Sequence, residues 1–200
     1  MERELIVTGI GGQGIQLAAA VVARAAVDEG REAQVFGSYG GMMRGGSTES
    51  TIVIADGAIV APPTVGETWS AILMHHEHAR HALACLRPGS LVFVNSTVVA
   101  DHGSLAERLT GEGCTVFEVP ASDMGAEVGH VMTGSMVMVG AYAAATGLVQ
   151  LPSLVTASSA SLPSYRAQHV ELNERALRVG FDSVPQGTVP AWPASVEAAR

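Results

Sequence analysis

The stretch from Leu5 to Gly14 reads LIVTGIGGQG and joins a short apolar run to a glycine-rich turn. Apolar residues then recur at helical spacing from Ile15 to Ala26. Gly30 stands where a helix C-terminal glycine is expected, and residues 33–36 form a second apolar run. The pattern predicts a strand, a turn, a helix and a second strand, with the two strands forming a parallel pair.

The alternation of strands and helices continues along the chain. Further strands are predicted at residues 50–54, 70–74, 91–95 and 114–119, and helices at 75–86, 105–109, 136–145, 151–160 and 165–179. The sequence around Asp56-Gly57 is typical of a hairpin turn into residues 59–60, so part of the sheet is expected to be antiparallel. We expect a single three-layer α/β/α Rossmann-like domain over residues 1–184, with a mostly parallel sheet and C-terminal helices. Residues 185–200 are expected to be an irregular tail that packs on a partner or frays.

Composition excludes several classes of protein. The chain has 200 residues, of which 48% are hydrophobic and 15% charged, enough for one sizeable core. Its net charge of −8 leaves no basic stripe for nucleic acid, and no apolar run approaches the roughly 20 residues that span a membrane. The N-terminus leads directly into a strand without a secretory signal, which indicates a cytoplasmic protein. Cys85 and Cys114 form no CxxC pair, so no metal or iron–sulfur site is expected in this chain.

The turn from Gly9 to Gly14 matches GxGxxG, a pattern that can hold a pyrophosphate at a helix N-terminus. A free-standing NAD(P)-binding protein is therefore one hypothesis. However, such a site needs an acidic residue at the end of the second strand, and the sequence there is Val35-Phe36-Gly37. Two alternatives stay open: the glycines only let the first helix approach the sheet, or they contact an anion such as CoA.

A second glycine-rich stretch, from Gly37 to Gly46, is expected to be a loop because five of its ten residues are glycine. It carries Arg44, whose guanidinium suits a carboxylate or phosphate. A structural ion pair at a subunit interface explains Arg44 equally well.

The run His75-His76-Glu77-His78, followed by His81, suggests a metal site at first sight. It misses the HExxH pattern because Arg80 replaces the second histidine. An exposed or interface helix is the better interpretation.

The two loops together resemble the gamma subunit, or gamma-like domain, of the 2-oxoacid:ferredoxin oxidoreductases of pyruvate, 2-oxoglutarate and indolepyruvate type. The resemblance rests on Gly11-Gly12-Gln13-Gly14, Tyr39-Gly40 and Arg44-Gly45-Gly46, and on two later stretches, residues 136–148 and 171–180. Two departures stand out: Ser135 replaces a frequent Asn, and Thr68-Trp69 replaces a usual Pro-Asp.

The resemblance implies a complex that oxidatively decarboxylates a 2-oxoacid with CoA to acyl-CoA and CO2 and passes electrons to ferredoxin or a similar acceptor. Thiamine diphosphate, Mg2+ and [4Fe-4S] clusters would lie on partner alpha, beta and ferredoxin-like delta subunits. This chain would supply no catalytic residue. Its candidate contacts to CoA or to a partner are Gly11, Gly12, Gln13, Gly14, Tyr39, Gly40, Arg44 and Gly45. The Arg44-Gly45-Gly46 motif looks more like the 2-oxoglutarate and aryl-pyruvate branches than the pyruvate branch.

A subunit of a complex should also bury an apolar interface. Met42, Met43, Trp69 and Trp192 are predicted to lie in loops or in the tail, where a monomer would expose them. We therefore expect these four side chains to contact a partner.

Overall fold

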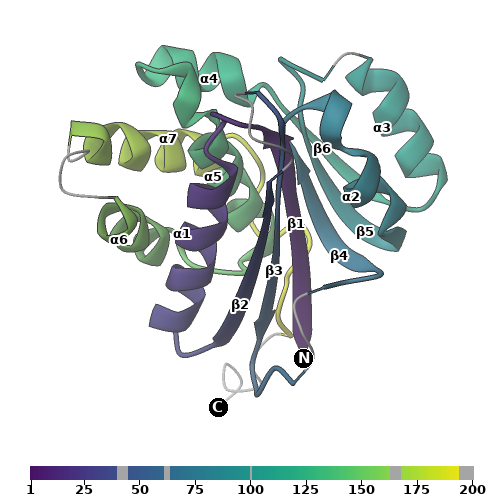
Figure 1. Ribbon diagram of the computed structural model, residues 1–200, viewed down its shortest axis with the longest axis horizontal. Coiled ribbons are helices and arrows are strands. Elements are labelled where there is room, and N and C mark those ends of the chain that lie inside the picture. The colour runs from purple at the N-terminus through teal and green to yellow at the C-terminus, as the bar shows by residue number, and fades with distance from the viewer. Residues whose placement is uncertain (40–44, 61–63, 100, 163–167, 194–200) are drawn as a thin grey trace.

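The computed structural model describes residues 1–39, 45–60, 64–99, 101–162 and 168–193, which form a six-stranded sheet between two layers of helices (Figure 1). The strands are β1 (Glu2–Ile10), β2 (Glu32–Tyr39), β3 (Ser47–Ala55), β4 (Thr68–Leu73), β5 (Leu86–Asn95) and β6 (Thr115–Val119). Their order across the sheet is β2-β3-β1-β4-β5-β6. Neighbours from β1 to β6 are parallel, whereas β3 is antiparallel to both β1 and β2. This confirms the predicted α/β fold with a mostly parallel sheet.

The prediction that the first two strands form a parallel pair is wrong. Strand β3 lies between them, so that Ile52 is paired with Leu5 on one side and with Val35 on the other. Only residues 40–46 separate β2 from β3, too few for the helical crossover that parallel neighbours require. The predicted hairpin after Asp56-Gly57 is also absent, because residues 58–60 form no strand. The antiparallel pairing in the sheet is instead made by β3, with β1 on one side and β2 on the other.

The helices cover both faces of the sheet (Figure 1). One face carries α1 (Ile15–Asp28), α4 (Ala121–Val128), α5 (Gly134–Thr146), α6 (Leu151–Ser161) and α7 (Val170–Asp182). The other face carries α2 (Arg80–Ala84) and α3 (His102–Gly111), and short 3-10 helices span His76–His78 and Val131–Thr133. The sequence did not predict α4. No described helix is long and apolar enough to cross a membrane.

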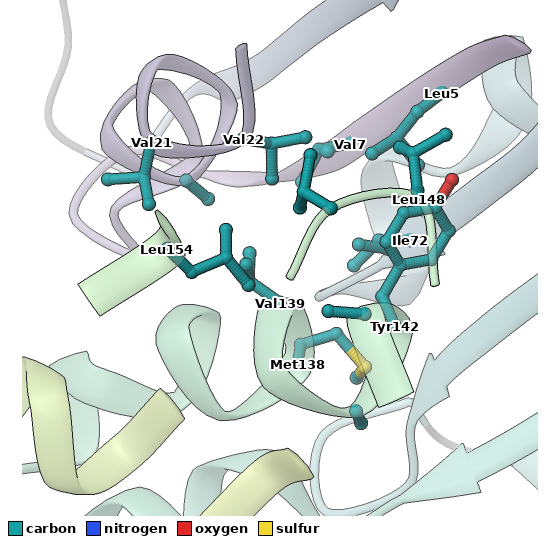
Figure 2. Packing of buried hydrophobic residues seen from close by; sticks show 14 of the residues in the cluster. Leu5, Val7, Val21, Val22, Ile72, Met138, Val139, Tyr142, Leu148 and Leu154 are labelled. Atoms are coloured by element: carbon teal, nitrogen blue, oxygen red, sulfur yellow. The ribbon is translucent and has the colours of Figure 1, made fainter. Parts of the chain in front are cut away.

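The core is divided by the sheet, and β1 contributes to both halves. Leu5 and Val7 point into the cluster that contains α1 and α5, whereas Ile6 belongs to the cluster under α2 and α3. Figure 2 shows Leu5 and Val7 close to Tyr142 and Val139 of α5. All thirteen residues of α5 are buried, as expected for a helix that is apolar on every side.

The segment from His75 to Gly89 differs most from the prediction. In place of one helix over residues 75–86, it forms the 3-10 turn His76–His78 and the five-residue α2. Leu86 already belongs to β5, and the strand register shifts after Leu86 so that Pro88 and Gly89 lie in an irregular part of the strand. A proline that cannot donate to a neighbouring strand is tolerated at such a position.

The tail packs on its own chain as far as the structure describes it. The amides of Gly187, Val189 and Ala191 donate to the carbonyls of residues 144, 145 and 146 at the end of α5, at 2.7–3.0 Å. The Trp192 indole donates to the Leu148 carbonyl at 3.0 Å and stacks on the Arg31 guanidinium, 4.0 Å from the ring centroid. The tail therefore satisfies carbonyls that a helix C-terminus leaves free. A domain boundary at residue 184 stays a prediction.

The expectation that Trp69 and Trp192 lie free for a partner is wrong. Trp69 lies inside β4, is 7% exposed and makes an edge contact with Tyr142. Trp192 is partly buried against this chain's own core. Met42 and Met43 lie outside the described residues, so a contact of these two methionines with a partner stays a prediction.

Trp192→Ala is expected to lower the free energy of unfolding by about 2 kcal/mol, because it removes one hydrogen bond and one cation–π contact. Trp192→Phe keeps an aromatic face for Arg31 and should lose only about half as much. Urea unfolding of both variants checks this. If the Phe and Ala variants were equally stable, the stacking on Arg31 would have no measurable role.

Candidate functional site

The glycine turn lies at the carboxyl edge of the sheet, between the end of β1 at Ile10 and the start of α1 at Ile15. Its backbone has positive φ at Gly12 (104°) and Gly14 (76°), conformations that favour glycine. The Gln13 side chain fixes the turn: its Oε1 accepts from the Ile10 amide at 2.9 Å, and its Nε2 donates to the Met74 carbonyl at 3.2 Å. Gln13 therefore has a positioning role that joins the turn to the end of β4.

The glycines of the turn divide into two groups. A Cβ on Gly9 would overlap the Gln13 side chain, and one on Gly14 would lie 2.8 Å from Ser135 Oγ, so these two glycines permit close packing. Gly12 has only the Met132 methyl group nearby, at 4.0 Å, and a Cβ on Gly11 would make ordinary contacts of 3.4 Å or more. Gly11 and Gly12 are exposed. Packing therefore explains Gly9 and Gly14, and it leaves Gly11 and Gly12 available for a ligand or partner.

The second loop meets the glycine turn directly. The Gly11 amide donates to the Gly46 carbonyl at 2.8 Å, and Gly45 has a φ of 84° with open space at the position of a Cβ. The structure thus brings Gly45 beside Gly11. Tyr39 is the last residue of β2, two residues beyond the predicted start of the loop. Gly40 and Arg44 lie outside the described residues, so their predicted contacts stay predictions.

Two helices begin at this place. Gly14 precedes α1 and lies against Ser135 in the first turn of α5. Neither helix has a side-chain cap or an acidic residue in its first turn. The Gly134 amide already donates to the Val131 carbonyl and the first turn of α5 is buried, so the uncapped N-terminus of α1 is the end that favours a negatively charged group nearby. Ser135 was noted in the sequence as a departure from the family pattern, and it was not placed beside the glycine turn.

An apolar rim flanks the turn. Val131 and Met132 are 55% and 47% exposed, although both are large hydrophobic residues. The His130 ring accepts from the Met132 amide at 3.1 Å and holds the start of this short 3-10 helix. Sequence reasoning missed this rim, because only the fold places residues 130–132 beside Gly12.

The histidine run lies next to the same edge. The His75 and His76 rings are stacked with centroids 4.7 Å apart, and Thr8 donates to the His78 carbonyl at 2.7 Å. Burial, followed by the neighbouring His76, lowers the pKa of His75, which favours a neutral ring. Among the described residues, no group of three or more His, Cys, Asp or Glu side chains is arranged to hold a metal ion.

The two cysteines are buried and unpaired with each other. Burial raises the pKa of both thiols, so they are protonated and unreactive at neutral pH. Cys85 and Cys114 therefore supply no nucleophile to the site.

The topology also bears on the NAD(P) hypothesis. In a dinucleotide-binding domain, the second strand lies next to the first and presents an acid to the ribose. Here β3 separates β2 from β1, and β2 ends at Ser38-Tyr39 without an acid. The glycine pattern alone is therefore a weak argument for a nicotinamide site.

Comparison with known proteins identifies the family. The family model described as pyruvate ferredoxin/flavodoxin oxidoreductase matches residues 4–183. The chain belongs to this family. Within the pyruvate ferredoxin/flavodoxin oxidoreductase family, the chain is 29% identical to the 2-oxoglutarate synthase subunit KorC of Methanothermobacter marburgensis, covering 94% of this chain and 99% of that protein. It is 26% identical to the indolepyruvate oxidoreductase subunit IorB of Methanothermobacter thermautotrophicus, covering 93% and 100%.

A solved structure agrees with this assignment. The gamma subunit of a keto/oxoacid ferredoxin oxidoreductase from Geobacter sulfurreducens superposes with a TM-score of 0.74 at 26% identity, covering 91% of this chain and 95% of that one. The predicted resemblance to gamma subunits of the pyruvate ferredoxin/flavodoxin oxidoreductase family is confirmed. None of these relatives supports the NAD(P)-binding alternative.

Proposed function

We propose that this chain is a non-catalytic gamma-type subunit in a cytoplasmic, thiamine-diphosphate-dependent complex that oxidises a 2-oxoacid with CoA to acyl-CoA and CO2. Alpha, beta and ferredoxin-like delta subunits would carry the thiamine diphosphate, Mg2+ and [4Fe-4S] clusters, and ferredoxin or a similar carrier would accept the electrons. The thiamine group supplies the carbanion chemistry when it is bound on those partners. Support comes from the family match over residues 4–183 and from relatives named as subunits of such enzymes.

One observation carries the role of this chain within the complex. Gly11 and Gly12 are exposed beside the uncapped N-terminus of α1, and Gly45 lies beside Gly11. The Gly11 amide is bound to the Gly46 carbonyl, so the exposed backbone at Gly12 and the first turn of α1 would receive an anionic group, without any acid, base or nucleophile. We propose that this surface contacts a phosphate of CoA or the backbone of a partner subunit, with Arg44 adding a charged contact.

The exposed rim favours assembly at the same place. Val131 and Met132 would be covered in a complex, which removes apolar surface from water. A gamma-type subunit seated over this rim would bring the glycine turn to the edge of a partner's active site. It would then help to exclude water from the reacting groups.

Two observations support a proposal for the substrate. The relatives include proteins named for 2-oxoglutarate and for indolepyruvate. The Arg44-Gly45-Gly46 motif looks like the same two branches. We therefore propose a 2-oxoglutarate or aryl-pyruvate substrate in preference to pyruvate.

Co-expression tests the proposal. The chain purified alone is expected to hold no flavin, nicotinamide or metal and to show no turnover, because its described residues offer no metal group and no acid for a ribose. Co-expressed with alpha, beta and delta subunits, it should copurify with them and support 2-oxoacid- and CoA-dependent reduction of a viologen dye. The control is the same set of partners without this chain, which should be less active. Stoichiometric NAD(P) on the isolated chain, or full activity without it, would contradict the proposal.

A further inference from the structure

A pocket of about 370 Å³ lies between α2 and α3, on the opposite face of the sheet from α1 and α5. It shares no lining residue with the glycine turn. Its walls are aliphatic side chains from the end of β4, from α2 and the residue before it, from the segment between β5 and α3, and from α3: Leu73, Ala79, Leu83, Val99 and Leu105. A volume near the lower end of the range for ligand pockets suits a small molecule with an apolar body.

Polar groups stand on the rim of this pocket. Ser104 and Arg108 are four residues apart on α3 and therefore share one face of the helix. Asp101 precedes the same helix, and His76 lines the pocket after β4. The pocket thus presents an anion and a permanent cation above an aliphatic floor.

The backbone at Asp101 is strained. Its φ of 56° makes it the one non-glycine residue with a positive φ among the described residues. This conformation costs about 1 kcal/mol for a residue other than glycine. The Asp101 carbonyl accepts from the Leu105 amide at 3.0 Å, which holds the residue at the start of α3 without using its carboxylate. The Asp101 carboxylate therefore makes no capping hydrogen bond to α3 and lines the pocket.

Arg108 is not locked by its structural partner. It pairs with Glu112 at 3.0 Å across one helical turn, and both side chains are 53% exposed. Exposed pairs of this kind contribute little to stability. The guanidinium therefore has donors left for a ligand.

We propose that this pocket binds an apolar α-amino acid. The aliphatic floor takes the side chain, the Asp101 carboxylate takes the ammonium group, and Arg108 with Ser104 takes the carboxylate. A zwitterion complements both charges of the rim. Amino acids and 2-oxoacids interconvert by transfer of an amino group, so the ligand is the amino counterpart of an aliphatic or aryl 2-oxoacid. That last link rests on the proposed function, whereas the binding itself does not.

Isothermal titration calorimetry of the full-length chain tests the binding. L-leucine and L-phenylalanine are expected to bind with a Kd of about 1 mM or tighter. Isocaproate lacks the ammonium group, isopentylamine lacks the carboxylate, and L-glutamate has a charged side chain. Each of these three should bind at least about tenfold more weakly.

Two variants connect the binding to the rim. Arg108→Gln and Asp101→Asn should each weaken L-leucine binding about tenfold or more, and Asn tolerates the backbone conformation at position 101. Arg178→Gln is the matched control, because Arg178 forms the same type of exposed pair with Glu174 on α7. Circular dichroism would verify that all three variants are folded.

Three results would overturn the proposal: no L-leucine binding up to about 10 mM, equal binding of isocaproate, or unchanged affinity in both rim variants. None depends on the partner subunits. A failure here would therefore leave the proposed function intact, and a failure to copurify would leave this pocket untouched.

Discussion

Gly180→Ala is expected to lower the free energy of unfolding by about 3 kcal/mol. Gly180 of α7 packs against the backbone of Val137 in α5, and a Cβ there would overlap the Val137 carbonyl oxygen and lie 2.6 Å from its carbon. Backbone atoms cannot move aside as a flexible side chain can, so the two helices would have to separate. Because α5 is the fully buried helix of the core, separation would disturb many contacts. Urea unfolding of the purified chain measures the loss.

The contact is reciprocal, which provides a second test. A Cβ on Gly140 of α5 would overlap the Leu177 carbonyl oxygen of α7, so Gly140→Ala should cost a similar amount. The double variant should cost less than the sum, because helices that have already separated leave room for the second methyl group. Gly111→Ala is the control: it lies in α3 with open space at its Cβ and should be neutral or slightly stabilising. Equal stability of Gly180→Ala and Gly111→Ala would contradict the packing argument.

Arg44→Ala is expected to lower 2-oxoacid oxidation by the assembled complex while the subunit remains folded. If Arg44 contacts an anionic group of CoA, the loss should appear as weaker CoA affinity. Removing a charge-assisted hydrogen bond costs about 1.5–3 kcal/mol, which is about a tenfold to hundredfold change. If Arg44 forms an ion pair with a partner, the variant subunit should fail to copurify.

Measuring CoA kinetics and subunit stoichiometry on the same preparation separates these two roles. Arg24→Ala is a suitable control. Arg24 is an exposed residue on α1, and its substitution by alanine removes the same charge from the chain. A complex of Arg44→Ala with normal composition and normal CoA kinetics would remove Arg44 from the site. Gly45 lies beside Gly11 in the structure, so such a result would leave the glycine turn as the remaining contact.

Much of the fold could be predicted because its elements have strong local signals. The apolar run before Gly9 and the helical spacing after Gly14 gave β1 and α1, and the Met136–Ala145 run gave α5. The prediction of one helix over residues 75–86 was wrong. The segment forms a 3-10 turn and the short helix α2, and strand β5 already begins at Leu86. Helix α4 was not predicted, because Gly125 interrupts its helical spacing of apolar residues. In the structure this glycine packs directly on Gly134.

The candidate site was predicted only in part. The sequence identified the glycines of the turn, but it could not divide them into those that allow packing and those that remain exposed. That division depends on Gln13 and on Ser135, which lies more than a hundred residues away in the chain. The exposed rim at Val131 and Met132 had no sequence signal of its own, since two apolar residues before a buried helix look like part of the core.

The sequence by itself determined the family resemblance, the alternating α/β pattern and the absence of a CxxC motif, because each of these is read from short local motifs and from their order along the chain. Only the tertiary structure decided the strand order and the contacts between distant segments. It placed β3 between β1 and β2, set the second loop against Gly11, and closed the tail over the end of α5. The physical reason is that these features depend on backbone hydrogen bonds and close packing between segments far apart in sequence, and hydrophobic periodicity carries no information about either.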